Sequence, residues 1–470
     1  MSTKLTIIGG GPGGYAAAFL AADLGMEVTL IDKEKNPGGV CLYRGCIPSK
    51  ALLHVAKLLN EAEEAKNWGI DFGKPKIDVD KLRDWKSSVV AKLTGGLGVL
   101  SKQRKINYIQ GTASFINSST LQIRKADGSS VDHKIEKAII ATGSRIATIP
   151  SLQIDSNRLL DSTTALDLPE IPKTLLVIGG GYIGLELASV YSALGTKVSV
   201  VEMLPGLLPG ADRDLVMHLQ KRIEKKYEKI MLNSHVTEMK EIGNSIHVKI
   251  ADKDGNINEE EFDYVLMSIG RKPVTEGLGL EYTRVKTNER GWINVNAQMQ
   301  TDDANIYAIG DIVGEPMLAH KASHEGRVAV EVIAGHKSAF EPKAIPGVVF
   351  TDPEIAWTGL TETQAKEKGI KHEVAKFPWA ASGRATTLDR SDGVTKLIID
   401  PDDERILGVG ICGPGAGELI AEGTLAIEMG ANATDLKLTI HPHPTLSETV
   451  MEAADVFFGQ STHMYRPKKK

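Results

Sequence analysis

The feature that most constrains the fold of this chain is a glycine-rich unit that occurs twice, with an offset of 170 residues. In each copy a short apolar run precedes a Gly-x-Gly-x-x-Gly loop, and a helical stretch and a second apolar run follow it. The second run ends in an acidic residue at the same distance from the first glycine in both copies. This order predicts two strand–loop–helix–strand units, one from Leu5 to Asp32 and one from Leu175 to Glu202.

Each unit has the parts that a dinucleotide needs. The first glycine permits a tight turn, the second lets the backbone approach a pyrophosphate, and the third lets the helix pack close to the strand. The helix amino terminus faces the phosphates, and the acid accepts hydrogen bonds from the adenosine ribose. One such loop is a weak signal, but two complete units predict two bound dinucleotides. The residues concerned are Gly9, Gly11, Gly14 and Asp32 in the first unit, and Gly179, Gly181, Gly184 and Glu202 in the second.

The acid of the second unit also indicates which nicotinamide nucleotide binds there. The carboxylate of Glu202 would repel the 2′-phosphate of NADP. The next residues, 203–205, include no arginine that would bind this phosphate. The second unit is therefore expected to bind NAD.

Length, charge and hydropathy narrow the class of protein. A chain of 470 residues is too long for one ordinary hydrophobic core. A net charge of −5 gives no electrostatic reason to expect nucleic-acid binding. No apolar stretch approaches the ~18 residues of a membrane span, and the first strand follows Lys4 too closely for a signal peptide. We expect a cytoplasmic protein, or a mature one whose transit segment has been removed.

The remaining sequence predicts an α/β protein of several domains. Buried strands are expected at residues 138–141 and 264–270, where each nucleotide-binding unit should end, and a third at residues 306–311 ends in Asp311. Residues 50–105 are rich in helical periodicity. Beyond about residue 343 the glycine loops cease, which indicates a separate carboxy-terminal domain.

The chain has only three cysteines. Cys412 lies in an apolar run and is interpreted as a core residue. The close pair Cys41 and Cys46 suggests redox chemistry or metal binding. On a straight helix, positions five apart are about 8–9 Å apart, but a disulfide needs less than about 7 Å between Cα atoms. Pairing would therefore require a distorted backbone, which Gly45 permits.

A helix is expected to follow the cysteine pair, from Ser49 to Ala65, with Pro48 at its beginning. Cys46 would then lie near the positive end of this helix, where a thiolate is stabilised. A zinc site, the main alternative for two close cysteines, lacks a nearby set of further ligands. His54 is interpreted as an ordinary helix residue.

A second candidate for chemistry is the segment His441-Pro-His443-Pro-Thr-Leu-Ser-Glu448. The prolines restrict the backbone around His443, and Glu448 is well spaced to orient its imidazole. An oriented histidine is a suitable general base for a thiol.

Together these motifs resemble the FAD-dependent pyridine nucleotide–disulfide oxidoreductases over the whole chain. The resemblance is carried by GGVCLYRGCIPSK, ATGS, GGGYIGLE, AIGD with MLAHKA, and HPHPTLSE. It implies two Rossmann-like domains and an α+β dimerisation domain, in a homodimer whose active sites join both subunits. The implied boundaries are 1–148 for the FAD domain, 149–272 for the NAD domain, 273–342 for a central domain that completes the FAD site, and 343–470 for the interface domain.

The resemblance also implies site residues. Cys41 and Cys46 would form the redox-active disulfide, with Lys50 and Glu186 paired beside the flavin and His443 with Glu448 as base and orienter. FAD would be held by Gly9, Gly11, Gly14, Asp32, Lys50, Ala113, Thr142, Gly143, Ser144, Asp311, Met317, Leu318, Ala319 and His320. NAD would be held by Gly179, Gly181, Gly184, Glu186, Glu202, Val236 and Gly270. No metal is expected.

Within the family, the resemblance implies oxidation of protein-bound dihydrolipoyl groups, with reduction of NAD+ to NADH. Partners would be the lipoyl domains and acyltransferase core of 2-oxo acid dehydrogenase complexes, or the lipoyl carrier protein of glycine cleavage. Residues 461–470 include no cysteine, unlike members with a carboxy-terminal redox pair. The alternatives are an NADH-dependent reductase of another disulfide or of a quinone, and a flavoprotein that serves only as a binding subunit.

Three positions depart from the family pattern. Asp32 replaces the commoner glutamate at the FAD ribose, Pro442 replaces a small residue and should stiffen the histidine loop, and Tyr43-Arg44 lies between the cysteines. A cation at position 44 is expected to favour a thiolate.

Overall fold

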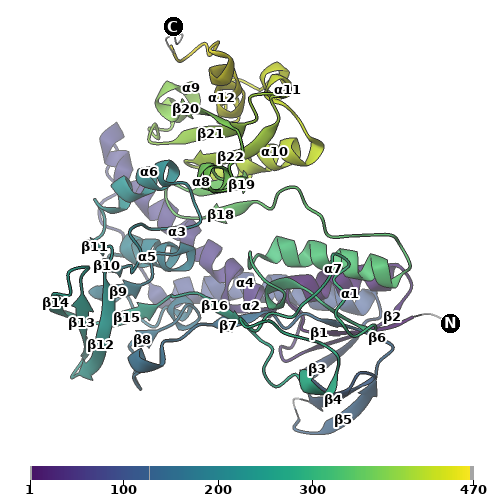
Figure 1. Cartoon of the computed structure of the whole chain (residues 1–470). Coiled ribbons are helices and arrows are strands. Elements are labelled where there is room, and N and C mark those ends of the chain that lie inside the picture. The colour runs from purple at the N-terminus through teal and green to yellow at the C-terminus, as the bar shows by residue number, and fades with distance from the viewer. Residues whose placement is uncertain (1–2, 126, 466–470) are drawn as a thin grey trace.

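A computed structural model describes residues 3–125 and 127–465. Three layered units make up the chain, each built on its own sheet (Figure 1). The α/β class expected from the sequence is confirmed. In Figure 1 the carboxy-terminal unit lies at the top, above the two nucleotide-binding units, which lie side by side.

The first unit is a seven-stranded sheet in the order β17-β6-β1-β2-β3-β4-β5. The first five of these strands pair in parallel, while β3, β4 and β5 form an antiparallel extension. Helices connect β1 to β2 and β2 to β3, as parallel pairing of consecutive strands requires. Strand β17 joins this sheet although it lies far along the chain. The strands are β1 (Lys4–Ile8), β2 (Glu27–Asp32), β3 (Asn107–Asn117), β4 (Thr120–Lys125), β5 (Ser130–Lys134), β6 (Lys137–Ile140) and β17 (Ile306–Ala308).

Helices cover this first sheet. Helix α7 packs against α1 along small residues: a Cβ at Gly13 would lie 2.9 Å from the Ala322 carbonyl oxygen. This close approach fixes the segment after β17 against the first glycine loop. The helices are α1 (Pro12–Asp23), α2 (Gly39–Arg44), α3 (Cys46–Glu64), α4 (Val79–Gln103) and α7 (Ala319–Ile333).

The second unit repeats the strand–loop–helix–strand arrangement in a sheet of order β11-β10-β9-β15-β8. A three-stranded antiparallel sheet packs beside it, and a ribbon of β7 and β16 connects the first two units. The elements are β7 (Ser144–Ile146), β8 (Leu159–Leu160), β9 (Thr174–Ile178), α5 (Tyr182–Leu194), β10 (Lys197–Val201), α6 (Arg213–Ile223), β11 (Lys229–Met231), β12 (His235–Ile242), β13 (Ser245–Ala251), β14 (Ile257–Phe262), β15 (Tyr264–Met267) and β16 (Arg271–Pro273).

The third unit is an antiparallel sheet of order β18-β19-β22-β21-β20, with helices against it. Its core includes Trp379 and Phe377, both fully buried. Cys412, on β22, is fully buried in the neighbouring core that includes the second unit, so it is a core residue as the sequence predicted. The elements are β18 (Gly347–Val349), β19 (Ile355–Gly359), α8 (Glu362–Glu367), β20 (Glu373–Pro378), α9 (Gly383–Thr387), β21 (Val394–Ile399), β22 (Ile406–Cys412), α10 (Ala416–Met429), α11 (Ala433–Leu438) and α12 (Glu448–Phe458).

A buried ion cluster connects the second and third units. The Lys396 side chain, on β21, is 1% exposed and lies 2.6 Å from a carboxylate oxygen of Asp212 and 2.8 Å from one of Asp214, at the beginning of α6. Glu362 completes the cluster at 3.3 Å. Burial raises the pKa of each carboxyl, but hydrogen bonds outweigh this effect and hold the pKa of Asp212 and Asp214 below the usual value. Lys396 makes the bond to Asp212, and Lys376, 2.7 Å from Asp214, makes the bonds to Asp214 together with Lys396.

Helix α3 begins three residues earlier than the sequence predicted. Its first residue is Cys46 rather than Ser49, and its last is Glu64 rather than Ala65. The backbone at Gly45 is outside the helical region, with φ −142° and ψ −111°, and separates α2 from α3. Cys46 can therefore take the first helical position instead of a place in the preceding loop.

Candidate active site

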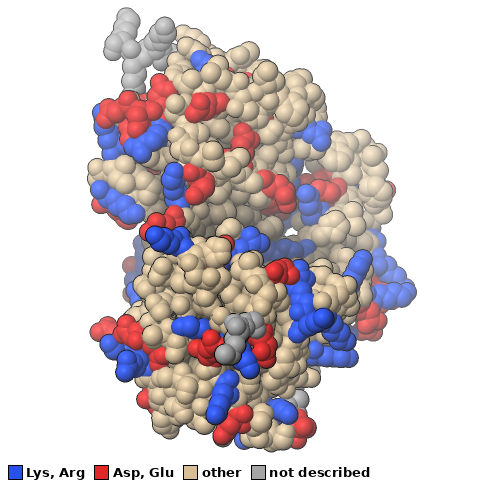
Figure 2. All heavy atoms as spheres, turned by 90° about the vertical axis from the view of Figure 1, so that its right-hand side faces the viewer, with Lys and Arg blue, Asp and Glu red and all other residues tan. Residues whose placement is uncertain are grey.

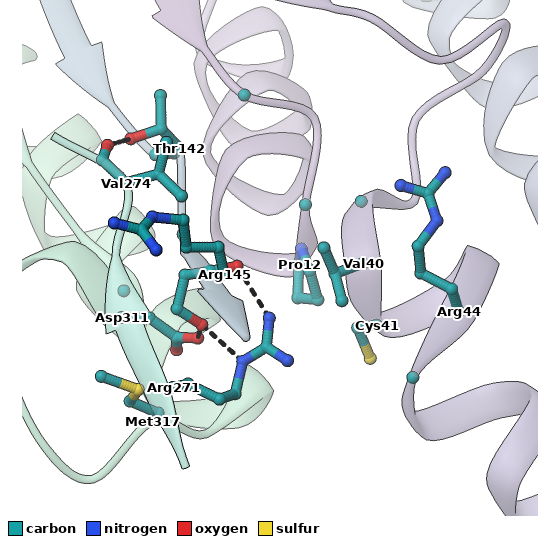
Figure 3. Close-up of a pocket in the computed structure, with 18 of the residues that line it drawn as sticks. Pro12, Val40, Cys41, Arg44, Thr142, Arg145, Arg271, Val274, Asp311 and Met317 are labelled. Atoms are coloured by element: carbon teal, nitrogen blue, oxygen red, sulfur yellow. Dashed lines mark hydrogen bonds between the residues drawn. The ribbon is translucent and has the colours of Figure 1, made fainter. Parts of the chain in front are cut away.

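A cavity of about 730 Å³ lies between the first unit and α5 of the second (Figure 3). Its volume is in the range of cofactor sites. Four segments far apart in the sequence form its walls: the first glycine loop, the cysteine segment, the turn after β6, and the turn after β17. Predicted residues in these walls include Gly9, Gly11, Asp32, Cys41, Cys46, Lys50, Ala113, Thr142, Gly143, Ser144, Glu186, Asp311, Met317 and Ala319.

Three predicted flavin contacts do not line the cavity. Gly14 lies beneath the loop, where a Cβ would be 1.8 Å from the Gly9 carbonyl oxygen. This is the close helix–strand packing that the third glycine was expected to permit. Leu318 caps α7, and the His320 ring bonds the Pro346 carbonyl at 2.9 Å instead.

The first glycine loop forms a cradle of the kind that a pyrophosphate needs. The nearest atom to a Cβ at Gly11 would be Cα of Gly39, 3.9 Å away. A side chain there would project into the space that a phosphate occupies at the beginning of α1. The Asp32 carboxylate accepts from the backbone N–H groups of Gly10 and Glu34 and lines the same cavity. These residues fit the adenosine and pyrophosphate of FAD.

The opposite wall is held by a chain of hydrogen bonds (Figure 3). Arg271 donates from Nε to the Ser144 hydroxyl and from a terminal nitrogen to the Ser144 carbonyl, both at 2.7 Å. The Ser144 hydroxyl donates to Asp311. The Thr142 hydroxyl donates to the carbonyl of Val274 at 2.8 Å. The ends of β6 and β17 are thereby fixed to β16.

The cysteine pair lies at the break between α2 and α3. The two thiols are in hydrogen-bond contact, and a Cβ at Gly45 would be 3.0 Å from the Val40 carbonyl oxygen. A Cβ would crowd this backbone, so glycine suits the tight approach that brings Cys41 and Cys46 together. This agrees with the distortion that the sequence predicted at Gly45.

The two thiols have opposite acidities. A hydrogen bond from Cys41 and the positive charge of the nearby Lys50 lower the pKa of the Cys46 thiol to about 7. Its place at the first position of α3 also favours the thiolate. The bond to Cys46 together with burial raises the pKa of Cys41. Cys46 is the residue poised as a thiolate, and Cys41 is its hydrogen-bond donor.

Lys50 and Glu186 form the predicted pair, with 2.8 Å between Nζ and Oε2. The second oxygen of Glu186 accepts the backbone N–H of Phe350 at 3.0 Å. The centroid of the Phe350 ring lies 4.5 Å from Lys50 Nζ, which adds a cation–π contact. Sequence reasoning missed Phe350, because nothing in the pattern around residue 350 indicates that it reaches α3.

Arg44 does not act on the thiols as the sequence predicted. Its guanidinium forms an ion pair with Glu34, and Figure 3 shows it directed away from the Cys41 sulfur. The cation that lowers the pKa of Cys46 is Lys50. The expectation failed because Arg44 ends α2 and reaches back to the loop after Asp32.

The second glycine loop keeps the predicted geometry. Glu202 accepts from the N–H groups of Gly180 and Leu204 at 2.6 and 2.8 Å. A Cβ at Gly181 would meet nothing within 4 Å, so the space before α5 is open. A Cβ at Gly184 would lie 2.3 Å from the Gly179 carbonyl oxygen. This open loop fits a dissociable dinucleotide, and Val236 and Gly270 flank the same sheet.

Two further residues of the second unit face the large cavity and were not predicted. Tyr182 follows Gly181 directly, and Arg271 follows Gly270. Each adjoins a predicted glycine, and that adjacency is the only signal the sequence offers. Burial raises the pKa of Tyr182 to about 12, so its hydroxyl is protonated at neutral pH.

His443 and Glu448 are bonded as expected, with 2.9 Å between Nδ1 and Oε1. Glu448 also accepts the Thr445 N–H at 2.7 Å, and these bonds hold its pKa below the usual value although burial opposes them. The His443 side chain is 74% exposed and is not part of the cavity wall formed by the described residues of the same chain. Within one chain the structure therefore keeps the dyad and the cysteines in separate units.

Two classes of site find no support within residues 3–125 and 127–465. No group of three or more histidine, cysteine or acidic side chains has a metal-binding arrangement there. No helix in this part of the chain has the length and hydropathy to cross a membrane.

Two family models match the chain. The model described as pyridine nucleotide-disulphide oxidoreductase covers residues 3–326, and the dimerisation domain of the same family covers residues 345–454. Together they span all three units.

The similar proteins agree with this match. The dihydrolipoyl dehydrogenase of Haemophilus influenzae is 49% identical over 470 residues, which cover 100% of this chain and 98% of that protein. The dihydrolipoyl dehydrogenase of Geobacillus stearothermophilus is 46% identical over 464 residues, 99% of this chain and 98% of that one. Among solved structures, LpdA from Mycobacterium tuberculosis superposes with a TM-score of 0.89 at 28% identity and covers 96% of this chain and 99% of that one. The chain belongs to the pyridine nucleotide-disulphide oxidoreductase family.

Proposed function

We propose that the chain is a dihydrolipoyl dehydrogenase, which oxidises protein-bound dihydrolipoyl groups and reduces NAD+ to NADH. The observation that carries this proposal is the contact of Cys41 with Cys46, at the first position of α3 and in the wall of the large cavity. The full-length similarity to dihydrolipoyl dehydrogenases supports it.

FAD and NAD are the two cofactors. The cradle of the first glycine loop supports FAD in the large cavity, and the open second loop with Glu202 supports NAD. Bound flavin supplies two-electron chemistry between the dithiol and the nicotinamide. The protein supplies the positions and charges around it, chiefly through Cys46, Lys50 and Asp311.

The proposed reaction begins at His443. Glu448 holds its Nδ1, so Nε2 is free to accept the proton of a substrate thiol. The resulting thiolate attacks Cys41 of the oxidised pair and forms a mixed disulfide, with Cys46 as the leaving thiolate. Attack of the second substrate thiol releases Cys41 and the oxidised lipoyl group. Lys50 and the beginning of α3 stabilise the charge on Cys46.

The separation of His443 from the cysteines supports an active site made by two subunits. The match to a dimerisation domain at residues 345–454 supports a homodimer. We place His443 of one subunit at the disulfide of the other. We further propose cytoplasmic location and association with 2-oxo acid dehydrogenase complexes or glycine cleavage, through lipoyl groups carried by those partners.

The test is a pair of assays on the purified flavoprotein. Rapid NADH formation from NAD+ and dihydrolipoamide is expected, together with no oxidation of NADPH by glutathione disulfide. No reaction in the first assay, with flavin bound and NADH still reducing a dye, would contradict the proposal. It would instead indicate a reductase of another disulfide or of a quinone.

A further inference from the structure

The loop that carries His443 contains a second histidine in a different environment. The side chain of His441 is 5% exposed, whereas that of His443 is 74% exposed. Both ring nitrogens of His441 have partners: Nδ1 lies 2.9 Å from the Thr439 carbonyl oxygen, and Nε2 lies 2.7 Å from Oε1 of Glu422 on α10. The two histidines of one short motif therefore have different roles.

The contacts of His441 use both of its ring nitrogens. Its two partners belong to different elements, because Thr439 follows α11 and Glu422 lies on α10. His441 therefore has no nitrogen left for a substrate.

His443 is the opposite case. Its Nδ1 is bonded to Glu448, and its Nε2 remains free at the surface. We propose that His441 is a positioning residue for the base: through Glu422 it ties the loop of residues 439–444 to α10 and so fixes the place of His443 Nε2. The inference rests on the proposed dithiol oxidation, and deepens it.

The other charged groups on the neighbouring elements have different partners. On α11, the Asp435 carboxylate accepts the Asn432 N–H, and Lys437 bonds Gln460. On α12, Glu452 bonds His463, and Glu448 bonds His443. Glu418 lies one turn before Glu422 on α10 and is exposed. Its negative charge adds to burial in raising the pKa of Glu354. Glu422 is thus the carboxylate bonded to His441.

Replacing His441 by glutamine tests this role. The Gln side chain can keep only one of the two contacts of the ring, so the loop would be held less firmly.

The experiment measures kcat and KM for dihydrolipoamide in wild type, His441→Gln and Glu422→Gln holoenzymes. We expect kcat of His441→Gln to fall roughly ten-fold with KM nearly unchanged, since a base held less firmly loses part of its advantage. Glu422→Gln should behave similarly, and reduction of a dye by NADH, which needs no base, should be unchanged in both variants.

His372→Gln is the matched control, because His372 bonds only a backbone carbonyl, that of Ile370, at 2.7 Å. It should leave the activity unchanged. A kcat of His441→Gln equal to that of the wild type would overturn the inference, as would a change in KM alone or an equal loss of dye reduction. If the wild type itself does not oxidise dihydrolipoamide, the proposed function fails and the inference falls with it, which is visible before any variant is made.

Discussion

At the scale of single residues, the chemistry depends on which of two adjacent thiols holds the negative charge. Cys46 holds it because Cys41 donates to it, Lys50 lies nearby, and α3 begins at its position. Cys41 is then the sulfur left for exchange with substrate. This asymmetry is a property of the reduced pair and is open to direct titration.

Replacing Cys41 by alanine is expected to make Cys46 less acidic. A hydrogen bond to a charged group is worth about 1.5–3 kcal/mol, so its loss should raise the pKa of Cys46 by about one to two units. The rate at which iodoacetamide alkylates Cys46, followed by mass spectrometry against pH, measures this value. We expect a midpoint of about 7 in the reduced wild type and a higher one in Cys41→Ala.

Cys412→Ala is the control for this titration, because Cys412 is a fully buried core residue. The alkylation midpoint of Cys46 in Cys412→Ala should equal that in the wild type. Equal midpoints in all three proteins would contradict the proposed donation from Cys41.

His443→Gln should separate the two half-reactions. Loss of the general base is expected to lower kcat for dihydrolipoamide by about 10²–10⁴-fold. Reduction of a small dye by NADH bypasses His443 and should be unchanged. Steady-state kinetics with both acceptors decides the matter: a parallel loss would assign His443 a structural role rather than that of a base.

Much of the site could be predicted, because many of its residues act together with residues near them in the sequence. The glycine loops, their acids, the cysteine pair and the His443–Glu448 spacing each depend on neighbours within about two dozen positions. Phe350, Tyr182 and the redirected Arg44 were not predictable, because their contacts are set by tertiary packing. Glu325 is a further example: it is buried and accepts the Gly310 N–H at 2.7 Å, behind Asp311.

At the scale of elements, Gly9 and Gly14 of the first unit make backbone contacts that leave no room for a Cβ. In Gly14→Ala the new Cβ would be 1.8 Å from the Gly9 carbonyl oxygen, and neither backbone can move without opening α1 from β1. We expect this variant to lose bound flavin, measured as the ratio of visible to ultraviolet absorbance after purification. A variant that keeps full flavin would contradict the packing described for the loop.

Gly96→Ala, in the middle of α4, is the matched comparison. A Cβ there meets nothing within 4 Å, so the substitution should stabilise the helix by about 0.5–1 kcal/mol and leave the flavin content unchanged.

The elements also show where prediction from sequence was least accurate. The strands next to the glycine loops agree with their predicted positions within a residue or two. Helix α3 began earlier than predicted because Gly45 allows a break between two helices, which a pattern of apolar residues does not reveal. Strand β17 was predicted as a strand, but its place beside β6 depends on contacts between distant residues.

At the scale of the whole molecule, Lys396 is expected to hold the second and third units together. In Lys396→Met, three carboxylates would lose their common buried cation, which should cost about 3–5 kcal/mol. The melting temperature and the denaturant midpoint measure this loss. Lys366→Met is the control, because Lys366 pairs with the same Glu362 but is 65% exposed, and its loss should have almost no effect.

The same cluster gives a pH dependence. The pKa values of Asp212 and Asp214 are lowered in the folded protein. Their ionised forms therefore contribute to the free energy of unfolding above the ordinary carboxyl range, and this contribution is lost as the pH falls through the lowered values. The stability difference between wild type and Lys396→Met should therefore shrink in acid. A difference that persists below the lowered pKa values would contradict an ionic origin.

The surface gives no sign of a nucleic-acid or single-sign electrostatic partner on the face that Figure 2 shows. Basic and acidic side chains are interspersed there, in agreement with the small net charge of −5. Recognition of a lipoyl group must then depend on local shape at the active site rather than on long-range attraction.

The carboxylate of Glu186 has a consequence for motion. One oxygen binds Lys50 of the first unit and the other binds the Phe350 N–H of the third, while Glu186 itself belongs to α5 of the second. If the second unit rotated as a rigid body, a displacement of about one ångström at the Glu186 carboxylate would break both bonds at once. Exchange of nicotinamide nucleotide at the open Gly181 loop is therefore expected to proceed without hinge opening between domains, so that turnover would not wait on a large conformational step.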